Sequence, residues 1–219
     1  YNLCCLVFSL GGSMEEYRTV EMSADDFFIE KKSKFIGYAK PVKTVEEATE
    51  FISQIRSKHW DATHNVYAYV LRENNTQRYS DDGEPGGTAG VPMLDVLLKE
   101  NLVDVCVVGT RYFGGTLLGA GGLVRAYSHT SKIAVEAAHI ITMAECDVMS
   151  VAVDYSFYKR MNILLFDFSA NIKDSDFADN VKITFSIKKD RVEALQAKLT
   201  DVSNGKYLLE YIGSEFAQV

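Results

Sequence analysis

The stretch that decides the fold is Gly109-Thr-Arg-Tyr-Phe-Gly-Gly-Thr-Leu-Leu-Gly-Ala-Gly-Gly-Leu-Val-Arg125. The run before it, residues 102–108, is almost entirely apolar, which is typical of a strand that is covered on both faces. After the glycines, apolar or small side chains recur every three or four residues from Leu123 to Ile141, and this spacing predicts a long helix. A strand, a glycine-rich loop and a helix N-terminus in this order favour an anion site, because unpaired backbone N–H groups and the positive end of the helix dipole meet there.

The common phosphate fingerprints do not fit this stretch. Gly114 and Gly119 have the Walker spacing, but Ala120 and Gly121 stand where a lysine and a serine or threonine would follow. Val124 occupies the place of the third glycine of a dinucleotide-binding motif. A structural role, in which the glycines let the helix pack closely against a strand, therefore stays open as an alternative.

A second glycine-rich segment, residues 80–92, is acidic at its start and leads into a short amphipathic helix with Pro92 in its first turn. Its carboxylates, Asp81, Asp82 and Glu84, could hold magnesium through water, act as acid and base, or stay solvated in a tight turn. We favour a pairing with Arg111, which would join both glycine-rich segments into one groove. This hypothesis expects Asp82→Ala and Arg111→Ala to be strongly non-additive in stability.

These segments resemble the signatures of the YigZ/IMPACT family. The matching stretches are Tyr79-Ser-Asp-Asp-Gly-Glu-Pro-Gly-Gly-Thr-Ala-Gly-Val-Pro-Met-Leu94, residues 110–127 and Lys58-His-Trp-Asp-Ala-Thr-His-Asn65, with Ser33-Lys34-Phe35-Ile36 upstream. The resemblance covers about residues 14–219 in the bacterial two-domain arrangement. For the first half it implies the α/β fold of the second domain of small-subunit ribosomal protein five. For the second half it implies the fold of the C-terminal domain of elongation factor G, so both likenesses are to translation proteins.

The fold class predicted is α+β with two domains. Residues 1–13 are interpreted as a leader from upstream or cloning sequence, residues 14–146 as the N-terminal domain and residues 147–219 as the C-terminal domain. In the second half, strand and helix periodicities follow one another in the order βαββαβ, which by itself indicates a ferredoxin-like unit. In the first half, a Thr44-x-x-Glu47 capping box opens a helix that precedes further strands.

Composition limits the classes of partner. The chain has 219 residues, of which 47% are hydrophobic and 24% charged, as in an ordinary globular protein. A net charge of −7 argues against indiscriminate nucleic-acid binding, so DNA is not expected and any RNA contact must be a local patch. No apolar run approaches the roughly 20 residues that cross a bilayer, so no membrane partner is expected. The cysteines form no CxxC pair or disulfide framework, which fits the cytoplasm.

Arg111 and Arg125 carry the most specific binding role, because the forked guanidinium group matches phosphate and carboxylate groups.

No histidine is expected to bind a metal ion. His64 is expected to orient a neighbour by hydrogen bonding, and His59 to be structural. His129 and His139 are expected to lie on the long helix without a partner. Lys31, Lys32 and Lys34 form a basic strand edge, more often a solvated face than a binding stripe. The predicted ligand- or phosphate-binding residues are Arg111, Tyr112, Gly114, Gly115, Gly119, Gly121, Gly122 and Arg125. The predicted groove-forming residues are His64, Asp81, Asp82, Glu84, Gly86, Gly87 and Thr88.

The function expected is that of a non-enzymatic, translation-associated regulator. It would bind RNA, the ribosome or a translation-control protein through the glycine- and arginine-rich groove of the N-terminal domain, and the resemblance implies a link to translational control under stress. The alternative is an enzyme or sensor that binds a nucleotide or a phosphorylated small molecule at the same groove. No catalytic residue, metal or cofactor is assigned, and the oligomeric state stays open.

Overall fold

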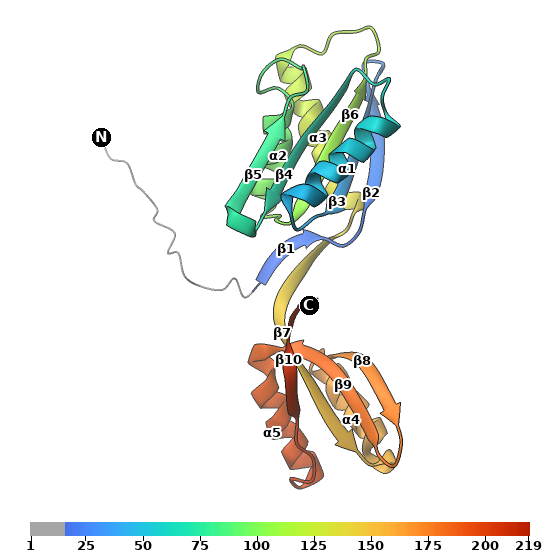
Figure 1. Ribbon diagram of the computed structural model, residues 1–219, viewed down its shortest axis with the longest axis vertical. Coiled ribbons are helices and arrows are strands. Elements are labelled where there is room, and N and C mark those ends of the chain that lie inside the picture. Colours follow the sequence, from blue (N-terminus) through green and yellow to red (C-terminus); the bar gives the residue numbers. More distant parts are fainter. Residues whose placement is uncertain (1–15) are drawn as a thin grey trace, which may run out of the picture. The chain divides into compact units, whose positions relative to one another are not determined.

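The computed structural model describes residues 16–219 (Figure 1). The predicted leader, residues 1–13, lies outside the described residues. The described chain divides into two compact units, residues 17–142 and residues 143–219 with Glu16. Both units contain helices and strands, so the predicted two-domain α+β organisation is confirmed.

The N-terminal unit is built on one five-stranded sheet with the order β2-β3-β6-β4-β5, in which all neighbours are antiparallel. Helix α1 covers one face, and helices α2 and α3 cover the other (Figure 1). The strands are β2 (Ala24–Glu30), β3 (Ser33–Pro41), β4 (His64–Leu71), β5 (Thr76–Ser80) and β6 (Val105–Tyr112). The helices are α1 (Val45–Lys58), α2 (Gly90–Lys99), α3 (Ala120–Ala137) and the short 3-10 helix η1 (Glu73–Asn75).

Strand β6 occupies the centre of this sheet and is buried on both faces, as its apolar sequence predicted. Val105 and Val107 pack into the core on the side of α2 and α3, whereas Cys106 and Val108 pack beneath α1. The strand continues through Tyr112, four residues beyond the predicted end. Gly109 and Arg111 therefore belong to the strand rather than to the loop that follows it.

The predicted capping box of α1 is confirmed, but the predicted end of α3 is wrong. At α1 the Thr44 hydroxyl accepts a hydrogen bond from the Glu47 N–H at 3.2 Å, and the Glu47 carboxylate accepts one from the Lys43 N–H at 2.7 Å. Helix α3 ends at Ala137, not at Ile141, because His139 adopts a left-handed backbone conformation with φ of 57°. His139 thus lies beyond the helix, with its ring 3.6 Å from a Glu21 carboxylate oxygen.

The edge strand β5 was not predicted. Its sequence, Thr76-Gln-Arg-Tyr-Ser80, is mostly polar and exposed, so it carries no alternating apolar pattern. It pairs with β4 from Tyr67 to Leu71, and the pairing rather than its own side chains holds it in place.

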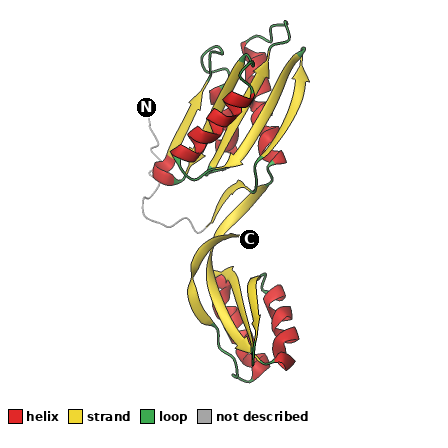
Figure 2. Ribbon diagram, turned by 45° about the vertical axis from the view of Figure 1, so that its right-hand side comes forward, coloured by secondary structure: helices red, strands yellow, loops and turns green. Residues whose placement is uncertain are grey.

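The C-terminal unit is ferredoxin-like, as predicted. Its strands pair in the order β10-β7-β9-β8, and its two helices share one core with the strands (Figure 2). The elements are β7 (Ile140–Val153), whose first residues belong to the N-terminal unit, α4 (Tyr155–Asp167), β8 (Asn171–Phe177), β9 (Val181–Lys188), the 3-10 helix η2 (Lys189–Arg191), α5 (Val192–Ser203) and β10 (Glu210–Gln218). Strand β1 (Glu16–Val20) also pairs with β7 but lies, apart from Glu16, in the N-terminal unit.

Two segments of this unit differ from what their composition suggests. The polar run Asp174-Ser-Asp176, which is typical of a turn, lies within β8, where an exposed edge strand tolerates polar side chains. Asn204 ends α5 in a left-handed conformation, but the strand that follows begins only at Glu210.

We expect Gly37→Ala to destabilise the N-terminal unit, because α3 crosses β3 closely at this point. A Cβ atom at Gly37 would lie 2.3 Å from the Thr130 carbonyl oxygen, and helix backbone cannot yield as a side chain can. The free energy of unfolding in urea should fall by about 1–3 kcal/mol. Gly86→Ala is the matched control, because nothing lies within 4 Å of the added atom. Equal losses for the two variants would contradict this account of the close approach.

Candidate functional site

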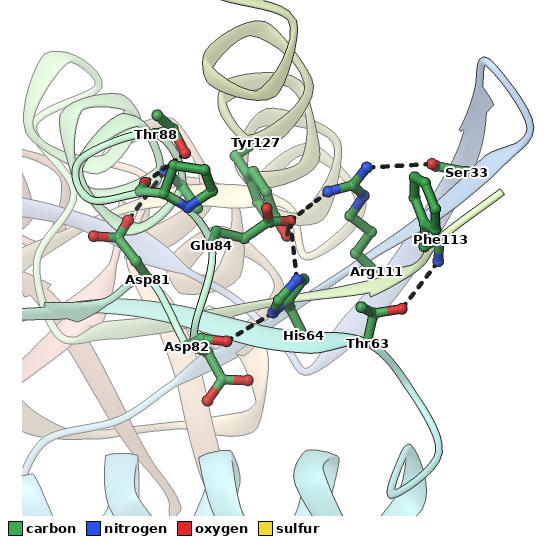
Figure 3. A network of polar contacts seen from close by, with 12 residues as sticks. Ser33, Thr63, His64, Asp81, Asp82, Glu84, Thr88, Arg111, Phe113 and Tyr127 are labelled. Carbon is green, nitrogen blue, oxygen red and sulfur yellow. Dashed lines mark hydrogen bonds and ion pairs between the residues drawn. The ribbon is translucent and has the colours of Figure 1, made fainter. Parts of the chain in front are cut away.

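Three side chains from adjacent strands form a row across the end of the N-terminal sheet. Arg111 of β6 is paired with Phe35 of β3 on one side and with His64 of β4 on the other. Cross-strand partners share a face, and here it is the face covered by α3, because Tyr127 of that helix packs edge-on against Phe35. The pleat of the sheet therefore places a guanidinium and an imidazole side by side beneath the helix (Figure 3).

A buried ion pair lies at the centre of the site. Arg111 Nη1 donates to Glu84 Oε1 at 2.6 Å, and both side chains are almost fully buried, with exposures of 6% and 3%. The Tyr127 hydroxyl donates to the same carboxylate oxygen at 2.8 Å. Burial and the neighbouring Glu84 charge both raise the pKa of Tyr127, so this phenol stays a neutral donor. Glu84 is thus held by a strand arginine and a helix tyrosine.

Two aromatic rings and a serine fix the rest of the guanidinium. The Arg111 guanidinium carbon lies 5.4 Å from the ring centres of both Phe35 and Phe113. Its Nη2 donates to the Ser33 hydroxyl at 3.4 Å, whereas its buried Nε has no hydrogen-bond partner among the described residues 16–219. The orientation of Arg111 is therefore set by packing on several sides.

His64 is oriented by the acidic loop. Its Nδ1 lies 2.8 Å from the backbone carbonyl oxygen of Asp82, and since a carbonyl only accepts, Nδ1 carries the proton. In the neutral ring Nε2 is then an acceptor, and it lies 3.8 Å from Glu84 Oε1. Gly83, with φ of 86°, makes the turn that presents this carbonyl to the ring.

The three loop carboxylates have three different partners. The Asp81 carboxylate accepts from the backbone N–H groups of Gly87, Ala89 and Gly90 at 2.8–3.1 Å, and so occupies the N-terminus of α2. Asp82 accepts from Arg56 of α1 at 2.7 Å and from the Asn65 N–H at 2.6 Å. The predicted pairing of the acidic cluster with Arg111 is therefore confirmed through Glu84. Asp82, which was expected to be coupled to Arg111, has other partners.

His64, Glu84 and Arg111 line a pocket of about 420 Å³, which we call the Gly/Arg groove. Its floor is polar and its rim is apolar, with Phe113 46% and Leu117 82% exposed. The lining residues are Thr63, His64, Gly83, Glu84, Pro85, Arg111, Phe113, Leu117, Leu118, Gly119, Ala120 and Leu123. Of the predicted site residues it therefore brings together His64, Glu84, Arg111 and Gly119.

The apolar rim and Tyr127 were not among the predicted site residues. Leu117 and Leu118 stand between the glycines, where apolar side chains in a flexible loop could have indicated an exposed binding edge. The helical spacing predicts Tyr127 only as a core residue of the long helix. Nothing in the sequence indicates that its hydroxyl donates a hydrogen bond to Glu84.

The other predicted residues have different positions. Arg125 is exposed and lines a second pocket with Lys31 and His129, so the two arginines do not share one site. His129 also has a ring neighbour, Phe28, at 4.6 Å between centres, contrary to the expectation that it has no partner. The loop residues Gly86, Gly87 and Thr88 shape the turn before α2, where the Thr88 hydroxyl donates to the Pro85 carbonyl at 2.6 Å.

The glycines after β6 have distinct roles. Gly114 allows close packing, because a Cβ there would lie 2.0 Å from the Lys32 carbonyl carbon. Gly115 and Gly119 have φ of 79° and 74°, which other residues adopt at a cost. Gly121 and Gly122 lie in the first turn of α3. The alternative that the glycines only allow close packing therefore accounts for Gly114. It does not account for Gly115 and Gly119, because no atom lies within 4 Å of a Cβ at either position.

Tyr112 points to the opposite face of the sheet from Arg111 and joins a hydrogen-bond chain there. Its hydroxyl donates to Asp61 at 3.0 Å, so it accepts from His59 Nδ1 at 2.9 Å, and His59 Nε2 accepts from the Tyr38 hydroxyl at 2.7 Å. Burial, followed by the Lys58 charge, lowers the pKa of His59. His59 is structural, as predicted, and the hydroxyl of Tyr112 already has two partners.

Residues 16–219 show neither a metal site nor a membrane-spanning helix. This part of the chain holds no group of three or more histidine, cysteine or acidic side chains placed to bind a metal ion. Nor does it contain a helix that combines the length and the apolar character needed to cross a membrane.

Comparison with known proteins matches both units. Residues 31–135 match the Impact N-terminal domain and residues 151–206 a domain of unknown function. IMPACT family member YvyE of Bacillus subtilis is 38% identical over 88% of this chain and 89% of its own length, and IMPACT family member YigZ of Escherichia coli is 34% identical over 82% and 89%. The human protein named Protein IMPACT is 30% identical over 54% of this chain and 39% of its own length. A crystal structure of a hypothetical protein covers 93% of this chain and all of that one, with 31% identity and a TM-score of 0.58.

We expect Glu84 and Arg111 to be strongly coupled in a double-mutant cycle. Glu84→Gln and Arg111→Met should each cost about 3 kcal/mol or more in urea unfolding, because either leaves one buried charge unpaired. The double variant should recover more than about 1 kcal/mol relative to the sum.

Asp82→Asn with Arg111→Met is the control cycle and should be additive within about 0.5 kcal/mol. Coupling that is larger for Asp82 than for Glu84 would contradict the geometry of the site.

We also expect His59 to make stability depend on pH. Its ordinary pKa of 6.5 applies to the unfolded chain, and the folded pKa is lower, so the unfolded state binds more protons as the pH falls below about 6.5. The free energy of unfolding should therefore decrease between pH 7 and pH 5, and decrease less in His59→Gln. Parallel urea titrations at the two pH values measure the difference, and identical slopes for wild type and variant would disprove the assignment.

Proposed function

The chain belongs to the IMPACT family, and from this premise we propose that it is a non-enzymatic, translation-associated regulator that acts in the cytoplasm. Its N-terminal unit would bind a protein component of translation, on the ribosome or among its control proteins, at the Gly/Arg groove. The observation that carries this proposal is the combination of a charge-compensated floor with an exposed apolar rim.

The floor argues for a protein segment rather than a phosphate in this groove. Arg111 is buried and already bound to Glu84, so a phosphate would have to displace that carboxylate and leave it unpaired. The rim offers Phe113 and Leu117, which are exposed apolar side chains next to a few fixed polar groups. Protein interfaces commonly use such an arrangement, in which apolar side chains give affinity and oriented polar groups give specificity.

His64 supplies the groove with one adaptable polar group. Its Nε2 is an acceptor in the neutral ring and faces Glu84, and its side chain is 18% exposed. A backbone N–H of a bound segment could donate to it without any change in the ion pair. The alternative of a nucleotide or phosphorylated small molecule gains no comparable support here, because the Glu84 carboxylate would repel an anion.

We expect the apolar rim to be needed for association with ribosomal particles. Tagged protein is expressed in cells, and lysate is sedimented through a sucrose gradient at low and moderate salt. Wild type should co-sediment with ribosomal particles, and Phe113→Ser/Leu117→Ser should lose most of that association, about tenfold or more, since exposed interface anchors each contribute about 1 kcal/mol or more. Both side chains are on the surface, so the variant should keep its fold.

The matched control is Ile163→Ser/Phe166→Ser, which removes two exposed apolar side chains, 54% and 83% exposed, from α4. It should sediment like the wild type. Wild type that stays at the top of the gradient at both salts would overturn the ribosomal proposal, and magnesium-dependent binding of ATP or GTP would then favour the alternative.

A further inference from the structure

A second pocket lies between the β2–β3 hairpin and the first turns of α3. It has a volume of about 320 Å³ and shares only Leu118 with the Gly/Arg groove. We call it the Arg125 pocket, and its lining residues are Phe28, Glu30, Lys31, Leu118, Gly122, Arg125, Ala126 and His129.

The Arg125 pocket gathers basic side chains on an acidic protein. Lys31, Arg125 and His129 line it, against the single carboxylate of Glu30, whereas the whole chain carries −7. Among residues 16–219, neither the Lys31 side chain nor the Arg125 side chain takes part in a hydrogen bond or ion pair. This contrasts with Arg111, whose charge is compensated by Glu84 at 2.6 Å. The positive charge of the pocket is therefore available to a ligand.

The backbone of the residues that carry these charges is well defined. Lys31 and Lys32 form the hairpin turn with φ of 46° and 68°, a conformation in which asparagine and glycine are usual and lysine is disfavoured. Gly114 packs directly against the Lys32 carbonyl group, which fixes the turn against the strand β6 end. The Arg125 guanidinium lies along the first turn of α3, with Nη1 3.7 Å from the position of a Cβ at Gly121.

Part of the wall of the Arg125 pocket is apolar. Phe28 is stacked on Phe35 with ring centres 5.2 Å apart, and Leu118 and Ala126 add further apolar lining. Apolar groups next to a charge lower the local dielectric, which strengthens the attraction between a bound anion and the flanking cations. The Glu30 carboxylate would repel a ligand with several negative charges. The pocket therefore fits a ligand group that carries one or two negative charges better than a highly charged one.

We propose that the Arg125 pocket binds a phosphate group, with the Arg125 guanidinium as a two-pronged donor and Lys31 as a second cation. The His129 ring adds a donor at the same opening. This site differs from the Gly/Arg groove in residues and in ligand chemistry, so it does not depend on the proposed function. The phosphate belongs either to an RNA backbone or to a free nucleotide, and both present the same group to the pocket.

The test measures binding of a fluorescein-labelled single-stranded RNA oligonucleotide by anisotropy, with unlabelled AMP and inorganic phosphate titrated separately by calorimetry. Arg125→Ala should weaken binding about tenfold or more, because a charge-assisted bidentate contact is lost. Lys31→Asn should weaken it severalfold while easing the turn, since asparagine tolerates positive φ. Glu30→Gln should tighten binding, because it removes a negative charge from the pocket. Misfolding would weaken binding and could not produce this increase in affinity.

Arg160→Ala, on α4 in the other unit, is the control for loss of one exposed positive charge, and its binding should match wild type. RNA binding with this pattern and a steep salt dependence would identify a polynucleotide backbone as the source. The same pattern with AMP or phosphate, but not with RNA, would support the site with a small ligand.

Absence of binding to all three probes at millimolar concentration, or equal binding by wild type and Arg125→Ala, would overturn the proposal. Phe113→Ser/Leu117→Ser should bind phosphate like the wild type. This variant therefore separates a failure of the phosphate proposal for the Arg125 pocket from a failure of the proposed function of the Gly/Arg groove.

Discussion

The buried ion pair between Glu84 and Arg111 is the interaction on which the arrangement of the N-terminal unit depends. A buried charge is costly unless it is paired and hydrogen-bonded. Here Arg111 of a strand pairs with Glu84 of a loop, and the Tyr127 hydroxyl of α3 donates to the same carboxylate. The long acidic loop is therefore anchored at a defined point of the sheet. His64 and the Gly/Arg groove take their positions from that anchor, because the same loop presents the Asp82 carbonyl to the imidazole.

The Glu84–Arg111 ion pair makes two surfaces of the same unit electrostatically different. The Gly/Arg groove has an electrically balanced floor and an apolar rim, whereas the Arg125 pocket is lined by the Lys31 and Arg125 side chains, which are unpaired within residues 16–219. Both surfaces use α3, whose glycine-rich start borders the groove and whose next turn carries Arg125. A protein that contacts both protein and phosphate-bearing partners would need such a division, and the ribosome offers both chemistries.

The sequence predicted the fold because the patterns that matter are local. The apolar run of β6, the Thr44 cap of α1 and the βαββαβ order each follow from neighbouring residues. The site was harder to predict, since it depends on where β6 ends. With a strand that extends to Tyr112, Arg111 and Tyr112 point to opposite faces, whereas a loop would have allowed both to serve one site. Choosing among Asp81, Asp82 and Glu84 was beyond sequence alone, because tertiary pairing and not spacing assigns each carboxylate its partner.

The Asp81 carboxylate at the start of α2 has a consequence for anion selectivity. It accepts hydrogen bonds from three backbone N–H groups, which is how a bound phosphate or carboxylate ligand would be held. Because it is tethered to the helix by a short loop, it acts as an intramolecular competitor at high effective concentration. Helix α3 begins at Ala120, and its N-cap residue Gly119 has no side chain that could cap it. The fold thus fills the N-terminus of α2 with its own carboxylate, so a dissolved anion would have to displace Asp81 to bind at that helix end.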